Sequence, residues 1–296
     1  MAHYLFVGDV SLDLSLQAPH MPAPDEKVHC TASTEGMGGV VTNTAVAFSR
    51  AGGSAALGIQ LGTDLASSQV RGELEAVLRL DLRPAVVPGG LCRVVTMIEP
   101  HGEKRLLLYP GVSIYPDAAA VAALRLDDIA HLHTACFGPA AEALVSRARQ
   151  AGISWSIDLE PASFSGGIAT LAPVLDGARI VFVNDRAADA IGGDPIARLR
   201  DLGVGDVVRT RGALGAELHR GAGEVLYAPP PKGLVIVDTT GAGDCLAGWF
   251  LAGIAAGWRI DTVLARAVRA ASIACTRVGA QTAYPTLSEL ELHEKD

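Results

Sequence analysis

The sequence predicts a doubly wound α/β fold, a mostly parallel sheet with helices on both faces, together with a small accessory β-sheet. From Asp117 onward, short apolar runs typical of buried strands alternate with segments of helical periodicity. Such alternation indicates a parallel sheet covered on both faces. Two earlier stretches, Ser15–Thr34 and Leu91–Tyr109, lack helical periodicity and indicate strands outside this alternating core.

The N-terminal half contributes the first core strands and helices. Tyr4–Val7 is an apolar run that ends at Gly8, as expected of a buried first strand. Thr42–Arg50 follows a glycine pair and is predicted to be helical. Ala55–Leu61 is expected to form a second strand, and Val70–Leu78 a second helix.

The two β-rich stretches indicate how the accessory sheet is inserted. Leu91–Tyr109 contains two β-type runs on either side of the turn at His101–Lys104, and Ser15–Thr34 is rich in proline. We therefore predict one domain over residues 1–296. The small sheet is formed by about residues 14–36 and 90–110, inserted in the N-terminal half.

The C-terminal half carries the regular alternation. The expected strands are Ile129–His133, Ser154–Leu159, Ile180–Asn184 and Asp206–Thr210, followed by a hairpin of Ala216–His219 and Glu224–Tyr227. The expected helices are Pro139–Gln150, Thr170–Asp176, Asp194–Leu202, Asp244–Ala256 and Thr262–Thr276.

Composition limits the class of protein. With 49% hydrophobic and 19% charged residues, the chain can bury a full core and is not disordered. Its net charge of -8 disfavours nucleic acid as a partner. Five widely spaced cysteines without a C-x-x-C pair indicate neither a disulfide framework nor a zinc site. We see no signal peptide or membrane span and expect a reduced, soluble, cytoplasmic protein.

The most informative segment is Val235–Phe250, VIVDTTGAGDCLAGWF, which is predicted to run from a strand through a glycine turn into a helix. Unpaired backbone N–H groups at a helix start, approached closely through glycine, can hold a phosphoryl group. Asp244 follows Gly241–Gly243 and could take the proton from an attacking hydroxyl. The alternative is that Asp244 only caps the helix; the complete D-T-T-G-A-G-D string favours chemistry.

That string resembles the second signature of the ribokinase (pfkB) family of carbohydrate kinases. Near the N-terminus, G-M-G-G-V-V-T-N-T-A at Gly36–Ala45 resembles the family's first signature. Gly38, Gly39 and Asn43 match it, whereas Val40 stands where relatives often carry Asn or Lys. The glycines would bring backbone against the substrate, and Asn43 would hydrogen-bond its hydroxyls. The alternative is a plain turn with an Asn cap.

Other motifs follow in the family's order. Asp13 resembles the aspartate that accepts hydrogen bonds from two sugar hydroxyls. T-R-G-A-L-G at Thr210–Gly215 resembles the nucleotide turn T-x-G-x-x-G. Asn184 resembles an Asn near the triphosphate, but Ala187 stands where relatives have an acid that helps to organise magnesium. The residues that the resemblance implies for ATP binding are Asn184, Thr210, Gly212, Gly215, Thr240 and Gly243.

The C-terminal T-R-x-G-A-Q run at Thr276–Gln281 is similar to ribokinase itself. In ribokinases this loop borders the adenine and, with the aspartate that opens D-T-T-G-A-G-D, holds potassium. Here that aspartate is Asp238, whose alternative role is to cap the turn. The implied ligands of the monovalent cation are Asp238, Thr240, Ala274, Arg277 and Gly279, mostly through backbone carbonyls.

The resemblance therefore implies an ATP-dependent kinase that transfers the γ-phosphate to a hydroxyl of a sugar or sugar-like molecule. Asp244 would be the general base and Gly241, Ala242 and Gly243 the anion hole, with Mg²⁺ and possible K⁺ dependence. The substrate stays open between ribose, a ketohexose, 2-keto-3-deoxygluconate and a nucleoside. The small sheet would act as a lid and could join two chains in a homodimer. The alternatives are a nucleoside kinase of the same family and a catalytically silent sensor of sugar or nucleotide.

Overall fold

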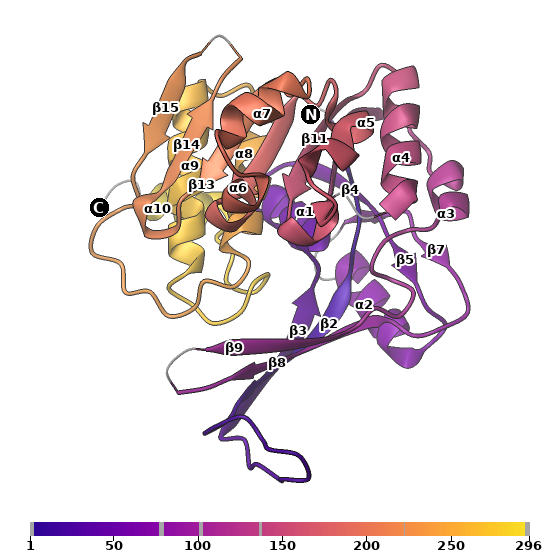
Figure 1. Cartoon of the computed structure of the whole chain (residues 1–296), viewed down its shortest axis with the longest axis vertical. Coiled ribbons are helices and arrows are strands. Elements are labelled where there is room, and N and C mark those ends of the chain that lie inside the picture. Colours follow the sequence, from indigo (N-terminus) through magenta and orange to yellow (C-terminus); the bar gives the residue numbers. More distant parts are fainter. Residues whose placement is uncertain (1–2, 77–79, 101–102, 136–137, 222, 294–296) are drawn as a thin grey trace.

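The computed structural model describes residues 3–76, 80–100, 103–135, 138–221 and 223–293. Within these ranges the chain forms a large α/β body, from which a smaller sheet projects (Figure 1). The predicted fold class is confirmed. None of the helices in the described ranges is long and apolar enough to cross a membrane.

The body is built on a nine-stranded sheet with the strand order β15-β14-β13-β12-β11-β10-β1-β4-β6. The strands from β13 to β6 are parallel, and β14 and β15 add an antiparallel hairpin at one edge. Their bounds are β1 His3–Val7, β4 Ser54–Gly58, β6 Asp81–Leu82, β10 Ile129–Ala135, β11 Ser154–Leu159, β12 Ile180–Asn184, β13 Asp206–Thr210, β14 Ala216–His219 and β15 Val225–Ala228. A separate short pair joins β5 Gln60–Leu61 to β7 Ala85–Val86.

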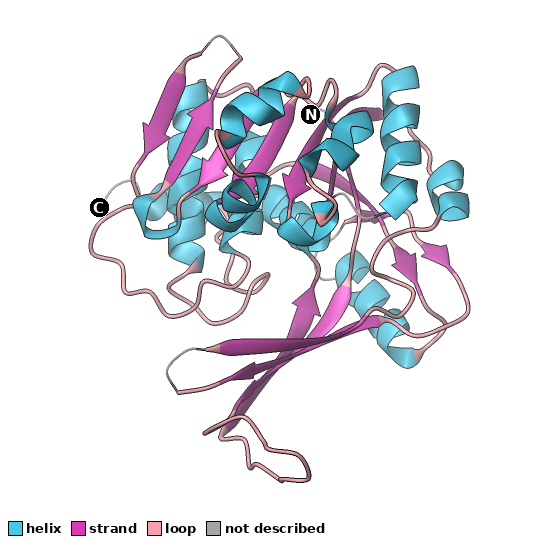
Figure 2. Ribbon diagram, in the orientation of Figure 1, coloured by secondary structure: helices cyan, strands magenta, loops and turns pink. Residues whose placement is uncertain are grey.

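Helices cover both faces of this sheet (Figure 2). Alternation along β1 shows the two layers, because Tyr4 and Phe6 pack into one core while Leu5 and Val7 pack into the other. The first core contains side chains of α1 Val40–Arg50, α2 Leu65–Ala76, α8 Ala242–Ala255, α9 Ile260–Ala274 and α10 Leu287–His293. The second contains side chains of α3 Ala118–Ala123, α4 Gly138–Gln150, α5 Ala172–Leu175, α6 Asp185–Ile191 and α7 Pro195–Asp201.

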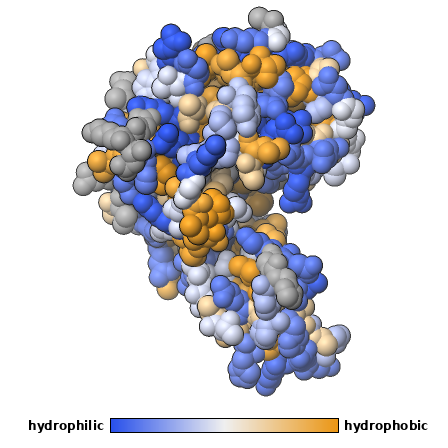
Figure 3. Space-filling model, turned by 90° about the vertical axis from the view of Figure 1, so that its left-hand side faces the viewer, coloured by the Kyte–Doolittle hydropathy of each residue, from blue (hydrophilic) through white to orange (hydrophobic). Residues whose placement is uncertain are grey.

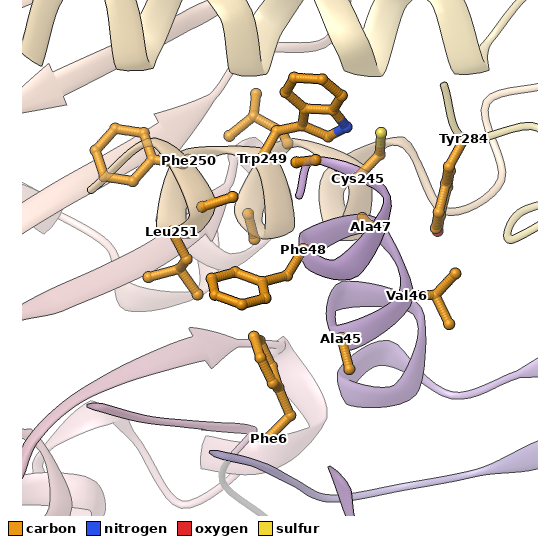
Figure 4. Close-up of a cluster of buried hydrophobic side chains, with 14 of the residues drawn as sticks. Phe6, Ala45, Val46, Ala47, Phe48, Cys245, Trp249, Phe250, Leu251 and Tyr284 are labelled. Atoms are coloured by element: carbon orange, nitrogen blue, oxygen red, sulfur yellow. The ribbon is translucent and has the colours of Figure 1, made fainter. Parts of the chain in front are cut away.

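Helices α1 and α8 pack against each other at unusually close range (Figure 4). A Cβ atom on Gly248 of α8 would lie 2.5 Å from the carbonyl oxygen of Thr44 and 2.6 Å from Cβ of Ala47, both in α1. Only glycine fits such a crossing. The contact fixes the N-terminal ends of the two helices relative to each other, and both ends carry predicted site residues.

The small sheet has the order β3-β2-β8-β9 and is called the lid sheet below. It consists of β2 Ser11–Gln17, β3 Ala32–Gly38, β8 Cys92–Ile98 and β9 Lys104–Tyr109. Strands β2 and β8 are parallel, and the two outer pairs are antiparallel. Figure 3 shows this part of the chain as a projection below the body, with an indentation where the two meet.

The structure corrects several predicted elements. Val235–Val237 was expected to be a strand, but it belongs to none of the described sheets and its three side chains are exposed. Its end is instead tied to α9, since the amides of Val237 and Asp238 both donate to the carbonyl of Cys275. Ala55–Leu61 is two strands because β4 pairs with β1 and β6, whereas β5 pairs with β7.

The helices of the structure differ from the predicted helices in several places. Helices α3, α6 and α10 were not predicted. Asp117 caps α3 and Asn184 caps α6, each by accepting a backbone N–H through its side chain. The segment expected as the helix Thr170–Asp176 is a 3-10 turn, Ile168–Leu171, followed by α5. Val77 and Leu78 at the end of the second predicted helix, His101 and Gly102 of the lid turn, and Cys136 lie outside the described residues.

Candidate active site

The site residues converge at the carboxyl ends of the parallel strands. Asp9 lies just beyond β1, Glu160 just beyond β11, and Asn184 and Thr210 end β12 and β13. The N-terminal ends of α1 and α8 face the same edge, because their residues Asn43 and Asp244 are hydrogen-bonded to each other. Open α/β sheets bind ligands at this edge.

The glycine turn forms the start of α8. The helix begins at Ala242, two residues before the predicted start, and its N-cap is Gly241 with a left-handed φ of 70°. A Cβ atom on Gly241 would lie 2.4 Å from the hydroxyl of Tyr284, which donates to the Gly241 carbonyl over 3.0 Å. Gly243 is exposed and borders open space. The geometry fits an anion at a helix N-terminus.

Asp244 is therefore the third residue of α8 and not its cap. Its Oδ2 accepts a hydrogen bond of 2.7 Å from Nδ2 of Asn43, and Oδ1 of Asn43 accepts one of 2.9 Å from Nε2 of Gln281. Asn43 was predicted to bind substrate hydroxyls; it is a direct partner of the predicted base. Gln281 was quoted in the C-terminal run but was not predicted to be a site residue.

Negative charges gather around Asp244. Burial raises the pKa of Asp244 to about 8, the hydrogen bond from Asn43 opposes the rise, and the charges of Asp9 and Glu160 add to it. Burial, together with the charges of Asp244, Glu160 and Asp9, holds the pKa of Asp158 well above its usual range. A carboxylate with a pKa near neutrality suits a general base.

The prediction missed Asp9, Asp158 and Glu160. Asp158 and Glu160 lie at the carboxyl end of the strand predicted at Ser154–Leu159. Because open α/β sheets bind ligands at the carboxyl ends of their strands, this pair of acids could have been recognised as part of the site. Burial raises the pKa of Glu160, as does the charge of Asp9, while Arg186 acts in the opposite direction. Of the three, Asp9 and Glu160 are the ones whose charges make Asp244 harder to ionise.

Asp9 anchors the start of α1. Its two carboxylate oxygens accept the amides of Val40 and Val41 over 2.9 and 3.0 Å, and its carbonyl accepts the hydroxyl of Thr42 over 2.6 Å. Gly39 must be glycine here, since its φ is 106° and a Cβ atom would lie 2.6 Å from the Asp9 carbonyl oxygen. Asp9 therefore fixes the helix that carries Asn43.

Asp13 lies on β2 of the lid sheet and packs against the other glycine of the predicted pair. Its Oδ1 accepts a hydrogen bond of 2.6 Å from Ser11, and burial raises the pKa of its carboxyl group. A Cβ atom on Gly38 would lie 2.2 Å from Oδ2 of Asp13. The glycine pair thus makes room for the Asp9 carbonyl and the Asp13 carboxylate.

Two of the residues predicted to bind ATP lie side by side on neighbouring strands, and two more lie in the turn that follows. Asn184 pairs with Thr210 in the β12–β13 register, and its Oδ1 accepts the amide of Ala187 over 2.8 Å. Gly212 and Gly215 both have positive φ and form the turn between β13 and β14. A Cβ atom on Gly215 would lie 2.1 Å from the Ala228 carbonyl oxygen.

The acid nearest to Asn184 does not stand free for magnesium. Asp185 accepts two hydrogen bonds from the guanidinium of Arg209, over 3.0 and 2.8 Å. Within the described ranges, no three His, Cys, Asp or Glu side chains are grouped so as to hold a metal ion.

Asp238 joins the glycine turn to the C-terminal loop. Its Oδ1 accepts from both the amide and the hydroxyl of Thr240, over 3.0 and 2.7 Å, and its Oδ2 accepts the amide of Gly279 over 3.0 Å. Burial alone would raise the pKa of Asp238, but these hydrogen bonds and Lys104 lower it overall. An ionised carboxylate between two loops fits a hard cation.

The other two predicted cation ligands, Ala274 and Arg277, lie at and just beyond the end of α9. Ala274 ends α9, and its carbonyl accepts the amide of Arg277 over 3.1 Å. The side chain of Arg277 turns away to Glu289, 3.2 Å from its Oε1.

Comparisons of the sequence and of the structure with known proteins both identify relatives that are named as kinases or phosphotransferases. The family model described as pfkB family carbohydrate kinase matches residues 1–287. An ATP-dependent ribose-1-phosphate kinase of Halopiger xanaduensis is 29% identical over 287 residues, which cover 96% of this chain and 92% of that protein. The acarbose 7(IV)-phosphotransferase of an Actinoplanes species is 28% identical over 285 residues, covering 92% and 91%.

Solved structures share the fold over the full length. Ribokinase from Thermotoga maritima aligns with a TM-score of 0.84 and 22% identity, covering 100% of both chains. A nucleoside kinase from Methanocaldococcus jannaschii aligns with a TM-score of 0.83 and 20% identity, covering 100% of this chain and 99% of the other.

Proposed function

Because this chain belongs to the pfkB family of carbohydrate kinases, we propose that it transfers the γ-phosphate of ATP to a hydroxyl of a sugar or nucleoside, with Asp244 as the general base. The observation that carries the proposal is the position of Asp244 on the first turn of α8, three residues after the left-handed Gly241. A proton acceptor and an anion-binding helix start therefore lie next to each other, as phosphoryl transfer to a hydroxyl requires.

In the proposed reaction Asp244 takes the proton of the acceptor hydroxyl as its oxygen attacks the γ-phosphate in line. The hydrogen bond from Asn43 favours the ionised form of Asp244, which is the form that can accept this proton. The backbone at Gly241, Ala242 and Gly243 would stabilise the charge that develops on the transferred group. Mg²⁺, held chiefly by the phosphates of ATP, would neutralise part of that charge.

The acceptor would lie between Asp13 of the lid sheet and the start of α1 at Gly38, Gly39 and Asn43. ATP would extend from the glycine turn toward Asn184, Thr210, Thr240, Gly212 and Gly215. Closure of the lid sheet would exclude water and so suppress hydrolysis of ATP.

The charges of the site favour an acceptor without a phosphate group. The charges that act on Asp244 belong to Asp9 and Glu160, and both are negative. A phosphorylated sugar would place further negative charge among them, which is unfavourable in a poorly solvated site. We therefore favour a neutral sugar or a nucleoside as the substrate.

The test is production of ADP by the purified chain with MgATP and a panel of acceptors. The panel contains ribose, a ketohexose, 2-keto-3-deoxygluconate, ribose 1-phosphate and several nucleosides. We expect turnover with at least one neutral acceptor and a loss of about 10²–10⁴-fold in kcat for Asp244→Asn, with nucleotide binding retained. Near-normal turnover of Asp244→Asn would refute the base. Binding of ligands without turnover of any acceptor would instead support the sensor alternative.

A further inference from the structure

We propose that Gln281 is a positioning residue, which holds the Asn43 side-chain amide in the orientation that donates a hydrogen bond to Asp244. This inference rests on the proposed function, because it concerns the immediate surroundings of the proposed base. It adds a residue from the C-terminal segment to a site otherwise built from the two helix starts.

The contacts form a continuous chain of three side chains. Nε2 of Gln281 donates to Oδ1 of Asn43 over 2.9 Å, and Nδ2 of Asn43 donates to Oδ2 of Asp244 over 2.7 Å. Gln281 and Asn43 are each only 6% exposed. Bulk water therefore does not readily replace either amide as a partner.

The chemistry of the amide makes its orientation decisive. An ionised carboxylate only accepts hydrogen bonds, so Asn43 can stabilise it with its N–H₂ end and not with its carbonyl end. Rotating the amide by half a turn would set Oδ1 of Asn43 against the carboxylate of Asp244. A donor from Gln281 fixes Oδ1 on the opposite side and so excludes the rotated form.

The segment that carries Gln281 is itself held firmly. The carbonyl of Tyr284 accepts Nη1 of Arg50 over 2.6 Å, and the hydroxyl of Tyr284 donates to the Gly241 carbonyl over 3.0 Å. Both contacts join this segment to the helices that carry Asn43 and Asp244. Gln281 is thus placed by the same framework that shapes the anion hole.

Stability alone does not account for glutamine at this position. Oε1 of Gln281 is buried, and no hydrogen-bond partner for it lies within the described part of the chain. A buried acceptor without a partner destabilises the fold; an apolar side chain of similar shape would remove that penalty but would leave Oδ1 of Asn43 without its donor, so the two choices differ little in stability. The N–H₂ end of the Gln281 amide donates a hydrogen bond to Oδ1 of Asn43, which an apolar side chain could not do.

The consequence is a shift in the pH at which the base ionises. The titratable groups that act on Asp244, or are acted on by it, are Asp9, Asp158, Glu160, Cys245 and Tyr284. Of these, the charges of Asp9 and Glu160 raise the pKa of Asp244, and the hydrogen bond from Asn43 opposes the rise. Activity is lost as the pH falls through the pKa of the base. Weakening the donation from Asn43 should therefore move the acidic limb of the rate profile to higher pH.

Two nearly isosteric variants test the proposal in the full-length chain. Gln281→Met removes the donor, and we expect the acidic limb of the kcat profile to move to higher pH by about half to one pH unit, while circular dichroism shows a retained fold. Gln281→Glu replaces the donor by an acceptor and also adds a negative charge that raises the pKa of Asp244, and we expect a larger shift of the limb. Activity should recover toward the wild-type rate above the shifted limb, which a general loss of structure would not allow. Thr282→Val, at the exposed neighbouring position, is the matched control and should keep the wild-type profile.

The outcomes separate this inference from the proposed function. If Asp244→Asn is inactive and both Gln281 variants keep the wild-type limb, the positioning role is wrong and the base assignment stands. If Asp244→Asn retains normal turnover, the base assignment itself is wrong. Should Gln281→Met fail to fold, Gln281→Leu, which also removes the donor without adding a charge, decides the question.

Discussion

Lys104, the first residue of β9, lies with its Nζ 3.9 Å from Oδ1 of Asp238, in the loop that leads into the glycine turn. The pair joins the lid sheet to the body, away from the point where β2 and β3 leave the body (Figure 1). Both side chains are partly exposed, so the contact contributes only about 0.2–1 kcal/mol. We expect an interaction of this size to restrain the lid sheet without preventing it from opening.

Removal of this contact should loosen the lid without touching the chemistry. For Lys104→Met we expect up to about a five-fold rise in KM for the acceptor and a rise in ATP hydrolysis without acceptor, with little change in kcat. Arg105→Met is the matched control, because Arg105 pairs with Glu99 inside the lid sheet over 3.2 Å. Equal effects of the two variants in steady-state assays would show that Lys104 has no special role.

The monovalent cation remains a prediction that centres on Asp238. This carboxylate is held ionised between Thr240 and Gly279, which suits a hard cation, and the backbone carbonyls of the same loop would complete the ligand set. Activity should rise when potassium replaces a bulky organic cation in the buffer. Asp238→Ala should abolish the response. Identical rates of the unaltered chain in both buffers would mean that no such site operates.

A buried histidine pair predicts acid sensitivity of the fold. Nδ1 and Nε2 of His131 contact the hydroxyls of Ser154 and Ser156 over 2.7 and 2.9 Å, and Nδ1 of His133 contacts Ser156 over 2.8 Å. Burial lowers the pKa of both rings to about 3. Both stay neutral in the folded chain, while the unfolded chain takes up protons below a pH of about 6.5.

Stability should therefore fall as the pH drops from about 6.5 toward 3, by up to about 1.4 kcal/mol per pH unit for each histidine. His133→Phe, beside Phe6 and Phe182, should reduce this slope, because phenylalanine does not titrate. Urea unfolding at several pH values measures it. An unchanged slope in the variant would contradict the prediction.

The parts of the site that could be predicted lie in contiguous strings. The turn at Gly241–Gly243 and the proposed base Asp244 are neighbours along the chain, so their order alone predicts an anion site beside a base. The role of Asn43 could not be read in this way. Its partners Asp244 and Gln281 are 201 and 238 positions away, and only the packing of α1 on α8 brings them together.

The predicted strand before Asp238 failed for a related reason. Val235–Val237 has the composition of a buried strand, yet Val235 is 78% exposed. β-Branched residues favour an extended backbone, but only a neighbouring strand with free hydrogen-bonding groups makes a sheet. Here the amide of Val237 is taken by the carbonyl of Cys275. The composition of a segment therefore predicts an extended backbone, but it does not predict whether a neighbouring strand is available to pair with it.

The lid sheet has two faces whose side chains can be assigned from the strand register. Asp13, Val94 and Leu108 are direct neighbours across β2, β8 and β9 and share one face. The opposite face carries an apolar cluster, here called the outer lid cluster, which consists of Leu14, Leu16, Val95, Met97 and Leu107. Strand β9 is the edge of the sheet, and Leu107 is 64% exposed.

A half-buried apolar face beside an unpaired edge favours association, because a second copy would bury the rest of the face and satisfy the edge. We therefore expect a homodimer that forms through the lid sheets. Light scattering at micromolar concentration measures the mass, and a single-chain mass that does not change with substrate would exclude the dimer. Since Val94 and Met97 point to opposite faces, Val94→Glu and Met97→Glu identify which face is buried. Val225→Glu, at an exposed position on the far edge of the body, is the control and should remain dimeric. A dimer broken equally by all three variants would place the interface elsewhere.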